Sequence, residues 1–146
     1  MTSRRRITVA LVGLVALVVV GWFARDLFTG SEPPGGCASA SAQSKVPGAA
    51  SGLRVCALSG LPKEAGTTWE SVRAGGPYKY PKNDNVDFFN REGVLPAKAR
   101  GYYREFTVPT PGESNRGARR LVTGQSGEVY YTADHYKSFV VVDPSR

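Results

Sequence analysis

The chain has 146 residues, of which 41% are hydrophobic and 21% are charged, so most of it can fold and its length suits one domain with a tail. Nineteen lysines and arginines against 12 aspartates and glutamates give a net charge of +7, which favours a polyanionic partner such as a nucleic acid or a membrane surface. One histidine and two cysteines exclude a multi-bridge disulfide scaffold and argue against a four-ligand zinc site, and the sequence has no G-x-x-x-x-G-K-[ST] loop for nucleoside triphosphates.

The N-terminal segment, residues 1–28, has the pattern of a membrane signal. Three arginines precede an uncharged run over residues 7–24, which as a helix would rise about 27 Å at ~1.5 Å per residue. A cleaved signal peptide is the alternative, but its apolar region is only about 7–15 residues long. Because this run is longer and ends at Trp22 and Phe23, we favour an uncleaved signal anchor. In both cases we expect the rest of the chain to be extracellular, either secreted or tethered to the outer face of the cytoplasmic membrane.

Residues 29–52 are rich in Ser, Ala, Gly and Pro, and this composition predicts a flexible linker because it cannot bury enough apolar surface. We therefore expect the folded domain over residues 53–146. Residues 37–146 carry 15 basic and 10 acidic side chains, a net charge of +5, so the domain itself is basic. A domain of this size is marginally stable, and a bridge between Cys37 and Cys56 would help in an oxidising compartment; two free thiols are the alternative.

One helix is expected at the start of the domain. Apolar residues recur at helical spacings of four, four and three, namely Leu61, Ala65, Trp69 and Val72. Pro62 suits the first turn of this helix, and Gly75 with Gly76 ends it.

Four short runs of β-branched and aromatic residues follow the helix, and we expect them to form antiparallel strands. They cover Tyr102–Val108, Ala118–Thr123, Glu128–Thr132 and Ser138–Val142. The segment Gly124–Gly127 has the composition of a hairpin connection. One helix packed on an antiparallel sheet is an α+β fold.

Ionisable side chains that suit phosphodiester chemistry gather in these strands. On alternation Glu105 shares a face with Tyr103 and Thr107, and His135 lies in a loop between two strands. Arg116, Arg119 and Arg120 stand close together near a strand start. A carboxylate can take a 2′-hydroxyl proton, an imidazolium can protonate the leaving oxygen, and arginines can offset phosphoryl charge. This scheme requires no metal, and we expect no cofactor.

Each of these residues also has a structural interpretation. A lone glutamate on a strand is most often solvated, a lone histidine is more often structural than catalytic, and clustered arginines are usually a generic anion-binding surface. From residue types alone, a non-enzymatic basic binding module is therefore favoured over a nuclease.

Longer motifs change this balance. The segments Gly101–Gly112, Arg116–Gly124 and Tyr130–Tyr136 resemble the small secreted microbial ribonucleases of the barnase-type, guanyl-preferring family, and most closely its shorter members. Asn90–Pro96 and Cys56–Pro62 resemble the same family. The resemblance covers about Leu53 to Asp143, in the same order and spacing.

The resemblance implies the microbial ribonuclease fold, with one helix on a curved antiparallel sheet. It makes Glu105 the general base and His135 the general acid, and it assigns the scissile phosphate to Arg120 together with Arg116. The implied activity is an endoribonuclease that cleaves single-stranded RNA after guanosine, through a 2′,3′-cyclic phosphate to a 3′-phosphate.

The resemblance also implies a guanine site. Its loop corresponds to Phe88, Phe89, Asn90 and Arg91, whose backbone N–H groups would bind the base, while Glu92 would bind its Watson–Crick edge. Phe88 and Tyr136 match the aromatic residues that stack on the base, a usual way of reading an unpaired base.

Two alternatives to the enzyme stay open at this point, a non-catalytic RNA-binding module on an inactivated ribonuclease fold and a structural domain on the cell surface. The expected partners are single-stranded RNA, an acidic inhibitor protein as known in the family, and the membrane through residues 7–24 if that segment is uncleaved. We expect the domain to be a monomer.

Three positions depart from the family pattern. Phe89 stands where close relatives often have a polar side chain, and Arg104 replaces the histidine that commonly precedes the catalytic glutamate. The C-terminus lacks the cysteine that often pairs with the equivalent of Cys56, which leaves Cys37 as its only available partner.

Overall fold

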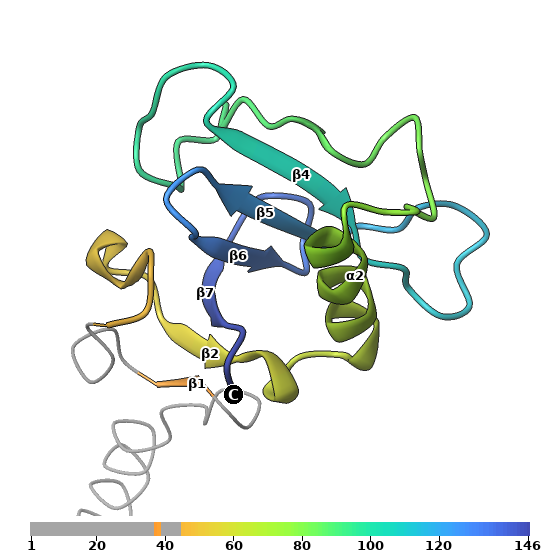
Figure 1. Ribbon diagram of the computed structural model, residues 1–146, viewed down its shortest axis with the longest axis horizontal. Coiled ribbons are helices and arrows are strands. Elements are labelled where there is room, and N and C mark those ends of the chain that lie inside the picture. Colours follow the sequence, from red (N-terminus) through yellow and green to blue (C-terminus); the bar gives the residue numbers. More distant parts are fainter. Residues whose placement is uncertain (1–36, 39–44) are drawn as a thin grey trace, which may run out of the picture. The chain divides into compact units, whose positions relative to one another are not determined.

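A computed structural model describes residues 37–38 and 45–146, so the predicted signal segment and most of the predicted linker lie outside the described residues. Seven strands form one sheet in the order β1-β2-β7-β6-β5-β4-β3 (Figure 1). The strands are β1 (Cys37–Ala38), β2 (Val55–Ala57), β3 (Val86–Asp87), β4 (Tyr103–Thr107), β5 (Arg120–Gly124), β6 (Val129–Thr132) and β7 (Val140–Asp143). The helix α2 (Lys63–Ala74) and two 3-10 turns, η2 (Ala49–Ser51) and η3 (Leu58–Gly60), complete the fold.

The four predicted strands and the predicted helix are confirmed as β4 to β7 and α2, with ends that shift by one or two residues. The prediction of a purely antiparallel sheet is wrong at one pair, because β2 runs parallel to β7. Within residues 37–38 and 45–146, no helix has the length and apolar character needed to cross a membrane.

The ends of α2 follow from its sequence. Pro62 is the N-cap residue, where a missing N–H costs nothing, and Gly75 ends the helix in the left-handed conformation with φ of 75°. Glu64 in the first turn and Arg73 in the last turn both suit the helix dipole.

The two faces of the sheet have different roles. Phe106 and Leu121 point toward α2, where they pack with Ala65 and Trp69 in one hydrophobic cluster. The opposite face carries a row of paired residues that runs across the sheet, Val86, Glu105, Val122, Tyr130, Val141 and Val55. The loops that cover this second face bring Phe88 and Phe139 into a second cluster. Glu105 therefore lies on the face of the sheet away from the helix.

The sheet continues into residues that the sequence assigned to the linker. Cys37 forms a disulfide with Cys56, and β1 pairs with β2. Ala49 is buried in the second cluster, with Val46 packed beside it. The residues from 45 onward thus belong to the packed domain, eight residues before its predicted start.

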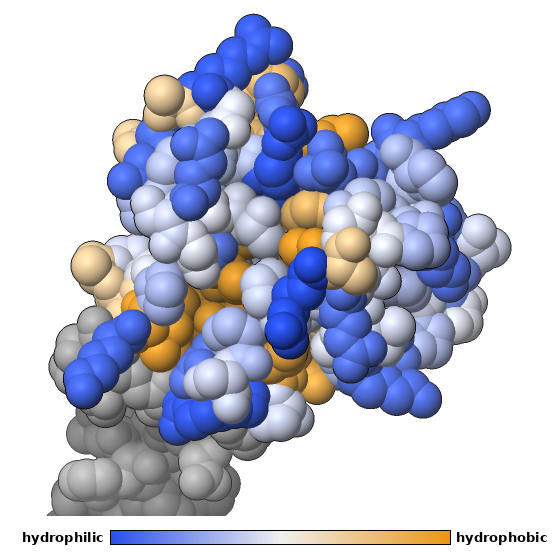
Figure 2. Space-filling model, in the orientation of Figure 1, coloured by the Kyte–Doolittle hydropathy of each residue, from blue (hydrophilic) through white to orange (hydrophobic). Residues whose placement is uncertain are grey.

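One face of the domain is mostly polar. On the face seen in Figure 2, hydrophilic side chains cover most of the surface, and apolar side chains show only in small patches in the middle of the view. This distribution suits a protein whose partner is charged rather than apolar.

Candidate active site

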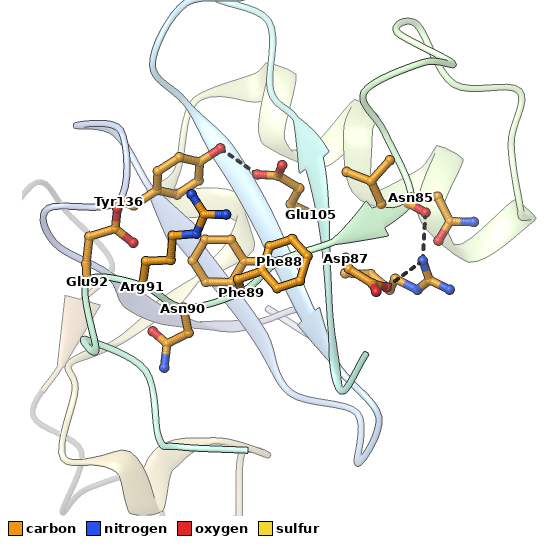
Figure 3. A pocket seen from close by; sticks show the side chains of 11 residues that line it. Asn85, Asp87, Phe88, Phe89, Asn90, Arg91, Glu92, Glu105 and Tyr136 are labelled. Carbon is orange, nitrogen blue, oxygen red and sulfur yellow. Dashed lines mark hydrogen bonds and ion pairs between the residues drawn. The ribbon is translucent and has the colours of Figure 1, made fainter. Parts of the chain in front are cut away.

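A cavity of about 810 Å³ opens on the face of the sheet away from α2. Eleven residues line it, and seven of them are predicted site residues: Phe88, Phe89, Asn90, Arg91, Glu92, Glu105 and Tyr136 (Figure 3). The other four come from β3, its flanking residue and the neighbouring strand: Asn85, Val86, Asp87 and Arg104. The structure thus brings the predicted guanine loop and the predicted general base into one cavity.

Glu105 and Tyr136 meet at one end of this cavity. The Tyr136 hydroxyl donates a hydrogen bond of 2.5 Å to Oε2 of Glu105 (Figure 3). Burial, and then this hydrogen bond, raise the pKa of Tyr136 to about 12, so its hydroxyl stays protonated over the physiological range. The strand position of Glu105, paired with Val86 on one side and Val122 on the other, fixes where its carboxylate lies.

Arg120 is a buried cation without a carboxylate partner among the described residues. It is only 3% exposed, and its Nη1 donates hydrogen bonds to the carbonyl oxygens of Gly117 and Arg119. Its Nε is buried and has no hydrogen-bond partner within the described part of the chain. Arg120 pairs with Thr107 in the sheet, so it shares the face that carries Glu105.

The Arg116 side chain binds Thr107, the residue that pairs with Arg120 in the sheet. Its Nε and Nη2 both donate hydrogen bonds to Oγ1 of Thr107, at 3.0 and 2.8 Å. Thr107 lies two residues after Glu105 on β4, so its side chain points to the same face. Arg116 and Arg120 therefore both bring positive charge to the face of the sheet that carries Glu105.

His135 lies in the loop between β6 and β7, as predicted, and it is exposed. His135 and Tyr136 have positive φ values of 59° and 73°. Asp134 stabilises this turn by accepting hydrogen bonds from Thr132 and Ser138. Burial alone would raise the pKa of Asp134, but the hydrogen bonds from Ser138 and Thr132 outweigh it and lower the pKa.

Neither His135 nor the two arginines line the cavity, but Tyr136, which lines it, lies close to His135 and Arg120. The His135 and Tyr136 rings have centroids 4.8 Å apart, and the Arg120 guanidinium carbon lies 5.9 Å from the centre of the Tyr136 ring. Since Tyr136 also binds Glu105, one side chain contacts the predicted acid, the predicted base and a predicted phosphate ligand.

The residues of the loop after β3 make different kinds of contact. Phe88 is buried, and its N–H donates to the Tyr103 carbonyl oxygen. The Asn90 side chain bonds both the N–H and the carbonyl oxygen of Leu95, so it closes the loop and is not free to bind a base. Glu92 is exposed and lines the cavity. The Phe88 N–H, which was predicted to bind the base, is therefore bonded within the domain and is not free. Phe88, Asn90 and Glu92 all line the cavity, and the Asn90 side chain shapes the loop.

The two aromatic side chains predicted to enclose a base are packed against each other. The ring centroids of Phe88 and Tyr136 are 5.2 Å apart, whereas a base between two rings needs roughly 7 Å, two contact distances of about 3.5 Å. The sandwich is therefore closed in this structure, and Tyr136 must move for a base to enter.

Two residues that support the site were not predicted. Asp134 holds the turn that carries His135, and Thr107 accepts both hydrogen bonds of Arg116. The Thr132-x-Asp134 spacing is a local turn pattern that sequence reasoning can find. The role of Thr107 depends on an arginine nine residues away, which local patterns do not show. Among the described residues, no group of three or more His, Cys, Asp or Glu side chains is placed to hold a metal ion.

Comparisons with known proteins give one consistent result. A sequence model of the ribonuclease family matches residues 44–143. The guanyl-specific ribonuclease St of Saccharopolyspora erythraea is 53% identical over 92 residues, which cover 63% of this chain and 90% of that protein. A solved structure of ribonuclease Sa2 in complex with mononucleotides superposes with a TM-score of 0.61 at 47% identity, covering 63% of this chain and 95% of the other. Ribonuclease Sa2 with guanosine-2′-cyclophosphate superposes with a TM-score of 0.59 at the same identity, over 63% of this chain and 97% of that one.

Proposed function

The chain belongs to the ribonuclease family, and we propose that it is an endoribonuclease that cleaves single-stranded RNA on the 3′ side of guanosine. Relatives that span nearly the same domain are guanyl-specific ribonucleases, and a related enzyme binds a guanosine cyclic phosphate. One cavity in this chain is lined by Phe88 and Glu92, the predicted guanine ligands, and by Glu105, the predicted general base. This lining supports the same activity.

The proposed reaction is a transesterification followed by hydrolysis. Glu105 takes the proton of the guanosine 2′-hydroxyl, and the 2′-oxygen attacks the phosphorus. The bond from phosphorus to the 5′-oxygen of the next nucleotide breaks as His135 protonates that oxygen, which leaves a 2′,3′-cyclic phosphate. In the second step His135 takes a proton from water, water attacks the phosphorus, and Glu105 protonates the departing 2′-oxygen to give a 3′-phosphate. DNA has no 2′-hydroxyl, so it is not a substrate.

The buried guanidinium of Arg120 is the observation that carries this proposal. A buried charge without a partner is costly, and a buried N–H without an acceptor costs about 1–3 kcal/mol. A phosphate beside Glu105 would supply both the missing charge and an acceptor for the free Nε of Arg120. Because charge builds on the phosphoryl oxygens during attack, Arg120 and Arg116 would stabilise the transition state most strongly.

Guanine recognition would use the loop after β3. The Glu92 carboxylate can accept hydrogen bonds from the N1–H and N2–H₂ groups of guanine, whereas adenine has no N–H at N1. Phe88 would stack on one side of the base and Tyr136, after moving, on the other. A non-catalytic RNA-binding module is less consistent with this chain, since Glu105, His135 and Arg120 are all present and lie around one ring.

The first test is cleavage of two dinucleotides by the full chain in the presence of EDTA. We expect GpU to yield guanosine 2′,3′-cyclic phosphate and ApU to react much more slowly. Glu105→Gln and His135→Ala should each lower turnover by about 10²–10⁴. Glu70→Gln on the exposed side of α2 is the matched control and should cleave GpU like the parent chain. Full activity of either site variant, or equal rates on GpU and ApU, would contradict the proposal.

We also propose that the domain acts outside the cytoplasm, either released or held at the membrane by residues 7–24. The sequence pattern of residues 1–28 supports export, and the lethal effect of a ribonuclease in its own cell gives export a purpose. The net charge of +5 over residues 37–146 would suit association with an acidic inhibitor protein.

A further inference from the structure

Phe89 has an environment that the guanine site does not explain. We propose that the Phe89 ring, together with the guanidinium groups of Arg91 and Arg100, forms a second base-binding site, which stacks the nucleobase of a nucleotide next to the bound guanosine. This inference rests on the proposed function, because it places the second base beside a guanosine held in the cavity.

The exposure of Phe89 is the first observation. Half of its surface is accessible, and it is the one large hydrophobic residue that is exposed in the part of the chain that the structure describes. Its neighbour Phe88 is only 8% exposed. Phe89 belongs to neither hydrophobic cluster of the core. An exposed aromatic face at the mouth of a cavity suits a ligand with a π surface.

Two arginines flank this ring. The guanidinium carbon of Arg100 lies 5.1 Å from the ring centre of Phe89, and that of Arg91 lies 5.5 Å from it. Figure 3 shows Arg91 beside the aromatic rings at the centre of the cavity. Both arginines are exposed, and neither forms an ion pair with any other described residue. Their charge is thus available to a phosphate group.

An aromatic ring between free cations favours a nucleotide over an apolar protein surface. A guanidinium over an exposed ring is a weak contact, and a stacked base is a stronger one. A base can therefore take the place of one arginine on the ring, and the displaced arginine can bind the phosphate that joins the two nucleotides. A hydrophobic protein partner would instead have to bury both charges beside the ring.

Position links this ring to the guanine site. Phe89 lines the same cavity as Phe88, Glu92 and Glu105, and it follows Phe88 directly in the chain. A guanosine held at Phe88 and Glu92 leaves its neighbouring nucleotide next to the Phe89 ring. The flanking base can come from the 5′ or the 3′ side of the guanosine, and the two dinucleotides below distinguish these sources.

The test measures binding of uncleavable 2′-deoxy ligands to the full chain by calorimetry. The probes are 2′-deoxyguanosine 3′-phosphate, written dGp, and two dinucleotides that add one neighbour to it, d(ApGp) on the 5′ side and d(GpU) on the 3′ side. Because stacking of one base strengthens binding roughly 5-fold or more, we expect one of the dinucleotides to bind at least 5-fold more tightly than dGp. Phe89→Ala and Phe89→Leu should both remove this gain, since leucine keeps the apolar bulk but has no aromatic face. Arg100→Ala should reduce the gain, and Arg73→Ala at the end of α2 is the matched charge control that should retain it.

Equal affinities for all three probes would overturn the inference, as would a gain that survives Phe89→Ala. Loss of the gain in Phe89→Ala but not in Phe89→Leu would show apolar contact without stacking and would also overturn it. Cleavage of GpU, measured in parallel, tests the proposed function separately. A dinucleotide gain that depends on Phe89 in a chain that does not cleave GpU would support the second base site and reject the activity.

Discussion

Tyr136 is the residue on which the candidate site depends most. It donates to Glu105, packs on Phe88 and lies against His135 and Arg120. Its ring would stack on guanine, and its hydroxyl keeps Glu105 in place while the site is closed. These two roles belong to different atoms, so substitutions can separate them.

Tyr136→Ala should weaken binding of guanosine 3′-monophosphate by about 5- to 100-fold, because a stacked base loses one of its two aromatic neighbours. Tyr136→Phe keeps the ring and should bind this nucleotide at least as tightly as the parent chain, since opening the site no longer breaks the bond to Glu105. Titration calorimetry of the two variants checks both expectations. Equal losses in both variants would assign the effect to the hydroxyl.

Asp134 is expected to position His135 without contacting substrate. Its carboxylate accepts three hydrogen bonds that hold the turn, and the next two residues both have positive φ. Asp134→Ala should therefore lower kcat on GpU about 10- to 100-fold through misplacement of the imidazole, while KM changes little. Asp134→Asn, which keeps one acceptor oxygen, should recover part of kcat. A change confined to KM would contradict a positioning role.

At the residue scale, the sequence predicts which residues form the site better than it predicts how their side chains are arranged. Seven predicted residues line one cavity, because the resemblance supplied a matching position for each of them. The closed packing of Phe88 on Tyr136 and the use of the Asn90 amide within its own loop were not predictable. Both depend on side-chain conformations set by contacts between distant segments, which a motif does not contain.

At the scale of elements, local signals decide what can be predicted. The helix shows its 3.6-residue period and its capping Pro62 and Gly75, and the four longer strands have β-branched runs between turns. The strands β1 and β3 have two residues each, too short to show any alternation. The parallel pairing of β2 with β7 joins segments about 85 residues apart, which no local pattern encodes.

The segment around η2 gives a prediction about where the domain begins. Gly48 has φ of 89°, and a Cβ there would lie 3.0 Å from Oη of Tyr130, which is buried. Gly52 has φ of 79°, but nothing lies within 4 Å of a Cβ placed there. A substitution at Gly52 therefore introduces backbone strain without a steric contact. We expect Gly52→Ala to lower the free energy of unfolding by about 1 kcal/mol, and Gly48→Ala to lower it by more. Urea denaturation measures both. No loss of stability in either variant would mean that residues 45–52 behave as the predicted linker.

At the scale of the whole molecule, contacts of Asp143 make the stability of the fold depend on pH. The Ser145 hydroxyl donates to Asp143 at 2.6 Å, and this bond, with smaller contributions from the Ser145 N–H and Arg146, lowers the pKa of Asp143. An unfolded aspartate has a pKa of about 3.9, so the stabilisation is complete above that pH and is lost as the pH falls through the lower folded pKa.

Asp143→Asn should therefore unfold at a lower urea concentration than the parent chain at pH 7, and the difference should shrink as the pH falls from about 4 to 2. Urea midpoints at several pH values provide the measurement. A difference that stays constant down to pH 2 would show that the carboxylate charge of Asp143 contributes nothing.

The Cys37–Cys56 disulfide determines which proteolytic cuts can release the domain. It joins the chain before residues 39–44 directly to strand β2, so a cut anywhere between Ala38 and Lys45 breaks the backbone but leaves both fragments covalently connected. If residues 7–24 anchor the protein, such a cut alone does not free the catalytic domain into the medium. Shedding then requires two events, cleavage and reduction, or a single cut ahead of Cys37.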